Sequence, residues 1–190
     1  MGSIEERMAK LESIGIHILP PYTLEDICQE FPDFIGEGYK GLLHVLGYPD
    51  YESTEADEVP RCNALYSFDT ECIEMNEGEY ISKIEALCKL TAGDLEVTEA
   101  SDSFSGWEDG EPLHVTIDFK CNGLPVHWEF DQTDDYFQPH VLDKLELLLK
   151  QSGSSRRFFA LEGDGQVAEV GCLLEDQVKE LEKLVGTKLL

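Results

Sequence analysis

Two histidine and aspartate pairs are the side chains of this sequence whose spacing best suits chemistry. Two alternating apolar runs flank Asn122-Gly123, the dipeptide most typical of a two-residue hairpin turn. If these two residues form the turn, Asp118 faces His127 across the hairpin and His114 faces Asp131. A carboxylate beside an imidazole fixes its tautomer and raises its pKa, as in a general base. The pattern therefore admits a hydrolase or metal-dependent enzyme as one interpretation.

Ordinary charge pairing on an outer sheet face explains the same four residues, and it is the commoner arrangement. Catalysis also needs a nucleophile or a pocket, and the sequence supplies neither a G-x-S-x-G motif nor a glycine-rich phosphate loop. An EF-hand loop starting at Asp131 fails, because Tyr136 stands where the loop requires glycine and Leu142 where it requires glutamate. An irregular cation site around Asp131, Asp134 and Asp135 stays open as an alternative to a solvated turn. We predict no catalytic residues, no bound metal and no cofactor.

The six cysteines are spread singly along the chain, which predicts reduced and mostly buried thiols. No pair has the C-x-x-C spacing of a structural zinc site. Cys62, beside Arg61, comes nearest to the basic setting of a reactive thiol, but in so acidic a chain an inert core cysteine is the better interpretation.

The elements that position these side chains follow from hydrophobic periodicity and turn residues. Helical stripes begin after a Thr23 and Asp26 capping box and at Pro139, and a last helix precedes Gly186. Strands are predicted at 61–73, 94–101, the two arms of the 113–130 hairpin, 156–162 and 167–173. In the hairpin register every second pair is apolar on both strands, so one face is core and the other is polar. The order of elements predicts one α+β domain over 1–190: an antiparallel or mixed sheet of about five to six strands with helices packed on it, and a helical N-terminal subregion at 1–49.

The charge of the chain limits its partners. The 190 residues include 40 acidic and 14 basic side chains, a formal net charge of −26. Such a chain repels a phosphate backbone and an anionic membrane surface, so we expect neither nucleic acid nor membrane as a direct partner. The sequence has no apolar run long enough to span a bilayer and no signal-peptide pattern at its start, which predicts a cytoplasmic protein.

Acidic residues and aromatic rings occur together in three segments. Residues 50–112 alone hold 18 acids and three bases. Aromatic anchors supply binding energy at protein interfaces, and complementary charge supplies speed and selectivity. The alternative to a binding surface is an ordinary solvated surface, in which carboxylates keep the chain soluble and a few rings are half-buried. We predict partner binding by the following residues: Asp50, Tyr51, Glu52, Glu55, Asp57, Glu58, Trp107, Glu108, Asp109, Glu111, Asp131, Asp134, Asp135, Tyr136 and Phe137.

In size, acidity and α+β layout the chain resembles the immunity proteins that bacteria make against secreted toxins. The resemblance covers the whole chain loosely and rests on no diagnostic motif, so it assigns no role to any residue by itself. It implies a basic protein partner, a toxin domain that is often a nuclease, whose positive cleft is covered by carboxylates standing in for phosphates. The alternatives are the enzyme described above and a structural or adaptor protein that uses its amphipathic C-terminal helix as a partner surface.

Overall fold

The computed structural model describes residues 2–50, 60–106, 112–161 and 166–189. Over these ranges the chain is an α+β protein with seven helices and six strands, and the strands form two three-stranded antiparallel sheets. The predicted fold class and number of strands are confirmed, with the strands divided between two sheets. By its contacts the chain forms two compact units, Met1–Phe68 with Ser155–Leu190 and Asp69–Ser154. Whether they act as the single domain expected from the sequence stays a prediction.

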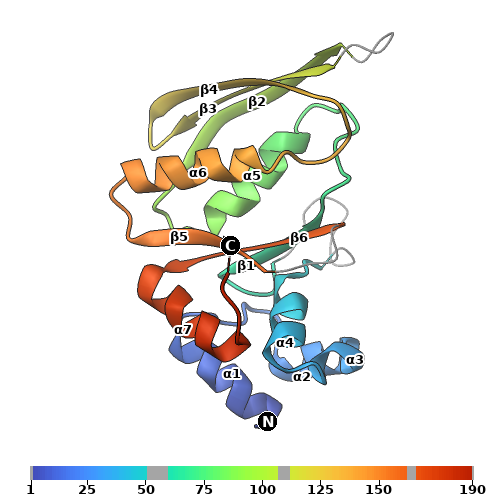
Figure 1. Ribbon diagram of the computed structural model, residues 1–190, viewed down its shortest axis with the longest axis vertical. Coiled ribbons are helices and arrows are strands. Elements are labelled where there is room, and N and C mark those ends of the chain that lie inside the picture. Colours follow the sequence, from blue (N-terminus) through green and yellow to red (C-terminus); the bar gives the residue numbers. More distant parts are fainter. Residues whose placement is uncertain (1, 51–59, 107–111, 162–165, 190) are drawn as a thin grey trace. The chain divides into compact units, whose positions relative to one another are not determined.

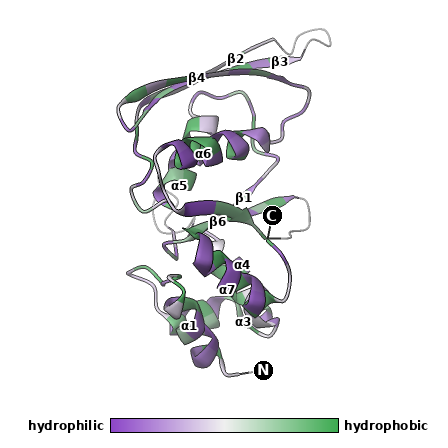
Figure 2. Ribbon diagram, turned by 60° about the vertical axis from the view of Figure 1, so that its left-hand side comes forward, coloured by the Kyte–Doolittle hydropathy of each residue, from purple (hydrophilic) through white to green (hydrophobic). Residues whose placement is uncertain are grey.

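The first unit combines N-terminal helices with a sheet of order β1–β6–β5, in which β6 is central. Its elements in chain order are α1 (Ile4–Ser13), α2 (Leu24–Glu30), α3 (Pro32–Ile35), α4 (Gly38–Gly47), β1 (Leu65–Asp69), β5 (Arg156–Ala160), β6 (Val167–Leu174) and α7 (Glu175–Val185). The capping box predicted at Thr23 and Asp26 starts α2. Figure 2 shows the two-sided colouring of amphipathic helices, whose apolar residues fill a core that includes Leu11, Leu42 and Phe159.

Glycines around 36–47 weaken the sequence signal for a helix there, yet α4 forms and most of its side chains are buried. Gly41 has a local reason to be glycine, because a Cβ at this position would lie 1.9 Å from the Phe34 carbonyl oxygen. Burial of Leu42, Leu43 and Leu46 therefore outweighs the low helix propensity of the segment.

The second unit is a sheet of order β2–β3–β4 whose apolar face carries both helices of the unit (Figure 1). Its elements are α5 (Glu79–Lys89), β2 (Val97–Gly106), β3 (Leu113–Cys121), β4 (Leu124–Gln132) and α6 (His140–Gln151). The predicted hairpin register is confirmed, including the pairing of Asp118 with His127. Asn122 and Gly123 have φ of 51° and 78°, the left-handed values that a tight hairpin turn needs.

Two predicted strands differ from the structure by more than two residues at an end. The strand predicted at 61–73 is shortened to Leu65–Asp69, and the strand predicted at 94–101 becomes Val97–Gly106. The register of β2 against β3 shifts between Thr98 and Ser101, where Glu99 has φ of 51°. This irregularity interrupts the alternation on which the sequence-based bounds depend. Of the helices described in the structure, none combines the length and apolar character needed to cross a bilayer.

Candidate functional site

Two acidic segments that lie far apart in the sequence meet around Tyr136. Glu71 and Tyr136 form an antiparallel β-bridge. Backbone bonds on either side reinforce it: the Ile73 N–H donates to the Asp135 carbonyl at 2.9 Å, and the Phe137 N–H donates to the Thr70 carbonyl at 2.7 Å. We call the resulting group, Tyr136 with Asp69, Glu71, Asp134 and Asp135, the Tyr136 cluster.

Electrostatics show that the carboxylates of the Tyr136 cluster act on one ring. The pKa of the Tyr136 phenol is raised, first by the negative charge of Glu71, then by partial desolvation, and further by the charges of Asp135, Asp134 and Asp69. The ring is 37% exposed. The cluster thus presents an accessible aromatic side chain within a negative field, which suits contact with a cationic surface.

The turn that carries Tyr136 is held by hydrogen bonds at the surface and by one buried hydrogen bond beneath it. Asp134 Oδ1 accepts from the Tyr136 N–H at 3.3 Å and from Gln138 Nε2 at 3.0 Å. Gln132 Nε2 donates to the Asp134 carbonyl at 2.8 Å, and the Tyr80 hydroxyl donates to Gln132 Oε1 at 2.6 Å. Burial raises the pKa of Tyr80, so this hydroxyl stays protonated and able to donate. The turn is therefore anchored to the core of its unit.

The structure places the predicted partner-binding residues unevenly. Asp131, Asp134 and Tyr136 are exposed and Asp135 is half-buried, so the third predicted segment lies at the surface. The expectation that Phe137 is an exposed aromatic anchor is wrong. Phe137 is only 6% exposed, and its ring packs against Tyr80 with ring centroids 5.2 Å apart. The Phe137 ring lies in the core beneath the turn, a position that the sequence pattern did not indicate.

Most of the other two predicted segments lies outside the described residues. Within the first, Asp50 is half-buried and accepts a hydrogen bond from the Tyr22 hydroxyl at 2.8 Å. The structure does not describe the remaining members, which are Tyr51, Glu52, Glu55, Asp57, Glu58, Trp107, Glu108, Asp109 and Glu111. Their role in partner binding stays a prediction.

Sequence reasoning missed the segment that faces Tyr136. Asp69 is the last residue of β1, Glu71 follows it, and Met75, which is 46% exposed, lies a few residues further on. The excess of acids in residues 50–112 was the available signal, but it did not identify which of them meet the 131–137 turn. The long-range bridge between Glu71 and Tyr136 and the backbone hydrogen bonds beside it do so.

The two predicted histidine pairs form on the polar face of the same sheet. His127 Nδ1 lies 2.7 Å from Asp118 Oδ1, and its Nε2 lies 3.0 Å from Glu129 Oε1. His114 Nδ1 lies 2.8 Å from Asp131 Oδ1. All five side chains are between 45% and 62% exposed, so the face is open to solvent. Within the described ranges no group of three or more His, Cys, Asp or Glu side chains is arranged to hold a metal ion.

Opposite pKa shifts are expected for two histidines of this unit. Hydrogen bonds to Asp118 and Glu129 raise the pKa of His127 above its usual 6.5, whereas burial and then Lys144 lower the pKa of His140. On raising the pH, His140 should lose its proton first and His127 last, as followed by the NMR signals of the imidazole rings. Asp118→Asn should lower the pKa of His127 and leave that of His140 unchanged. Equal pKa values for the two rings would contradict the described geometry.

The raised pKa of His127 also makes the stability of the fold depend on pH. Because its folded-state pKa is raised, its ion pairs stabilise the fold below the unfolded-state pKa near 6.5. That contribution is lost as the pH rises through the folded-state value. Because hydrogen bonds to two carboxylates favour the protonated form of this exposed histidine, the geometry does not favour a general base at this position.

The cysteines agree with the inert interpretation. All six are free, and burial raises the pKa of Cys62 to about 11. The guanidinium of the neighbouring Arg61 is directed elsewhere, to Glu30 Oε1 at 2.6 Å and the Tyr48 carbonyl at 3.0 Å. Cys62 is therefore not activated as a nucleophile.

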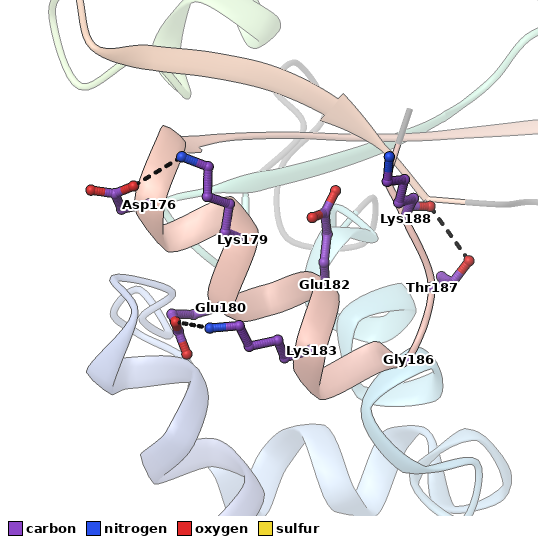
Figure 3. Close-up of a pocket in the computed structure, with 8 residues that line it drawn as sticks. All are labelled: Asp176, Lys179, Glu180, Glu182, Lys183, Gly186, Thr187 and Lys188. Atoms are coloured by element: carbon purple, nitrogen blue, oxygen red, sulfur yellow. Dashed lines mark hydrogen bonds and ion pairs between the residues drawn. The ribbon is translucent and has the colours of Figure 1, made fainter.

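A hollow in the first unit lies beside α7, the helix considered as an adaptor surface (Figure 3). Lys179 pairs with Asp176 at 3.1 Å and Lys183 with Glu180, so these cations are neutralised within their own helix. The apolar stripe of α7, with Val178 and Leu181 fully buried, belongs to the core. Neither feature favours a ligand site over ordinary helix packing.

Comparisons with protein-family models, with curated proteins and with solved structures each returned no match.

Proposed function

We propose that this chain is a small acidic binding protein of the immunity or inhibitor type, which covers a basic site on a partner toxin. The observation that carries the proposal is the meeting of two acidic segments around the exposed ring of Tyr136. Residues 69–154 as a whole hold 20 acidic side chains against five lysines. The negative potential of the Tyr136 cluster therefore adds to the negative potential of the whole unit.

The Tyr136 cluster has the two components that a specific cationic partner requires. Its carboxylates attract the partner during encounter and reject acidic competitors. Its tyrosine supplies a large contact area with few rotatable bonds and stacks well on arginine. On a nuclease toxin the complementary surface is the phosphate-binding cleft, where the carboxylates take the place of the substrate phosphates.

The open polar face of β3 and β4 supports binding over catalysis. An enzyme that used Asp118 and His127 would hold them in a cleft that excludes water, whereas both side chains are more than half exposed. An exposed and charged sheet face is a suitable surface for a protein partner. Under the proposal these residues extend the binding surface.

Affinity capture from the native cell extract tests the proposal. At about 50 mM salt the immobilised full chain should retain a basic protein, and about 500 mM salt should release it, because charges separated by more than a Debye length are screened. Adding the free chain to the captured protein should inhibit the toxic or nuclease activity of that protein, in proportion to the amount of complex formed. Retention that is indifferent to salt, or a captured protein that is acidic, would count against the proposed function.

A further inference from the structure

We propose that the free edge of β4 is a docking site for an extended segment of the partner protein, one whose basic and apolar residues alternate. This inference rests on the proposed function and specifies how the partner is held. In the described part of the chain β4 borders its sheet and has β3 as its neighbour. Figure 1 shows that β4 lies on the side of the sheet away from β2.

The turn geometry determines which backbone groups β4 directs outward. Cys121 and Leu124 flank the two-residue turn and form its closing pair. Hydrogen-bonded and non-hydrogen-bonded pairs alternate along an antiparallel ladder, so Val126, Trp128 and Phe130 direct their backbone groups to β3. The N–H and C=O groups of His127, Glu129 and Asp131 then point to the free edge, where an added strand can pair with them.

Charge complementarity defines one face of the occupant. The side chains of Glu129 and Asp131 lie on β4, on the polar face at this edge, and both are more than half exposed. A neighbouring strand places its own side chains about 5 Å from these carboxylates, so lysine or arginine there forms cross-strand pairs. A second copy of this acidic chain would bring like charges together, which disfavours self-association along the edge.

Incomplete burial of the apolar side chains of β4 indicates which residues the other face of the added strand should carry. On β3 the inward residues Val115, Phe119 and Cys121 are buried, whereas their β4 partners Phe130, Val126 and Leu124 are not, and Leu124 is 70% exposed. The apolar face is thus left partly open along the edge strand. Apolar side chains on an added strand would cover it.

The opposite edge of the sheet is less suited to pairing. The register of β2 breaks between Thr98 and Ser101, and Glu99 lies there with positive φ and an ion pair to Lys120 at 2.6 Å. Such a break in register is one of the features that normally prevent pairing at an edge strand. β4 keeps a continuous register with β3 from Leu124 to Gln132.

Blocked peptides of alternating lysine and valine provide the test, with the isotope-labelled full chain followed by NMR. Titration at low salt should shift the amide signals of His127, Glu129 and Asp131 and slow their hydrogen exchange. Two control peptides of equal charge carry backbone N-methyl groups, one on the lysines and the other on the valines. Because alternate residues of a strand direct their N–H groups to opposite edges, only one of the two controls should lose affinity, by about tenfold or more.

The possible results separate the two proposals. Equal affinity of the two N-methylated peptides, or amide shifts confined to residues outside β4, would overturn edge pairing and leave charge-based binding in place. Failure of every basic peptide to bind, even at low salt, would contradict the attraction of basic chains on which the proposed function itself depends.

Discussion

Combined replacement of Glu71 by Gln and Asp135 by Asn should slow association with the basic partner by about tenfold at low salt. Glu71 is the largest contributor to the raised pKa of Tyr136, and Asp135 is the next charge in order. The turn keeps its supports, because Asp134 Oδ1 holds the Tyr136 and Gln138 nitrogens and Asp69 Oδ1 accepts from the Glu71 N–H at 2.9 Å. The measurement is the association rate at about 50 and 500 mM salt, and the difference between wild type and variant should shrink at the higher concentration.

A matched variant separates local charge from total charge. Glu12→Gln with Glu85→Gln removes the same two charges from exposed helical positions in α1 and α5. This control should retain most of the wild-type association rate. A second readout needs no partner: the pKa of Tyr136, followed by the NMR signals of its ring, should fall toward the usual value for tyrosine in the Glu71 and Asp135 variant and stay raised in the control. Equal slowing by the two variants would show that only net charge matters.

Asp102→Ala should lower the free energy of unfolding by about 3 kcal/mol. The N-cap of α5 is Gly78, which has no side chain to cap the helix. The Asp102 carboxylate, 4% exposed on β2, accepts instead from the backbone N–H groups of Gly78, of Tyr80 at 2.8 Å and of Ile81 at 3.2 Å. Its removal leaves two buried N–H groups and one half-buried N–H group without this acceptor and takes a negative charge from the positive end of the helix dipole.

Urea unfolding followed by circular dichroism checks this expectation. Asp102→Asn, which keeps one acceptor oxygen, should lose less stability than the alanine variant. Ser103→Ala alters the next residue of β2, on the exposed face, and should change the free energy of unfolding by less than about 0.5 kcal/mol. If the Asp102 and Ser103 variants unfolded at the same urea concentration, the capping role of Asp102 would be refuted.

The hairpin was the most predictable part of the fold because its information is local. Alternation with period two and a turn dipeptide that adopts positive φ determine its register without any long-range contact. Helix α2 was predictable for the same reason, since its capping box and apolar stripe lie within one segment. The pairing of Asp118 with His127 followed directly.

Long-range partners could not be predicted in this way. The bridge between Glu71 and Tyr136 joins short irregular segments that have no periodicity, so nothing local indicates the pairing. Asp102 shows a different failure: a carboxylate within an alternating strand indicates a solvent-facing position, yet the uncapped end of α5 draws it inward. The burial of Phe137 depends likewise on Tyr80, 57 positions earlier in the printed sequence. In each case tertiary contacts override the local pattern.

The central claim is that the Tyr136 cluster touches the partner, and site-specific photo-crosslinking tests it most directly. A photoreactive phenylalanine analogue is placed at position 136 or, as a control of matched exposure, at Phe34, which is 39% exposed in the other unit. In native extract at low salt, position 136 should crosslink to a basic protein and lose the adduct at about 500 mM salt, whereas position 34 should give none. An adduct formed at position 34 but not at position 136 would contradict the account.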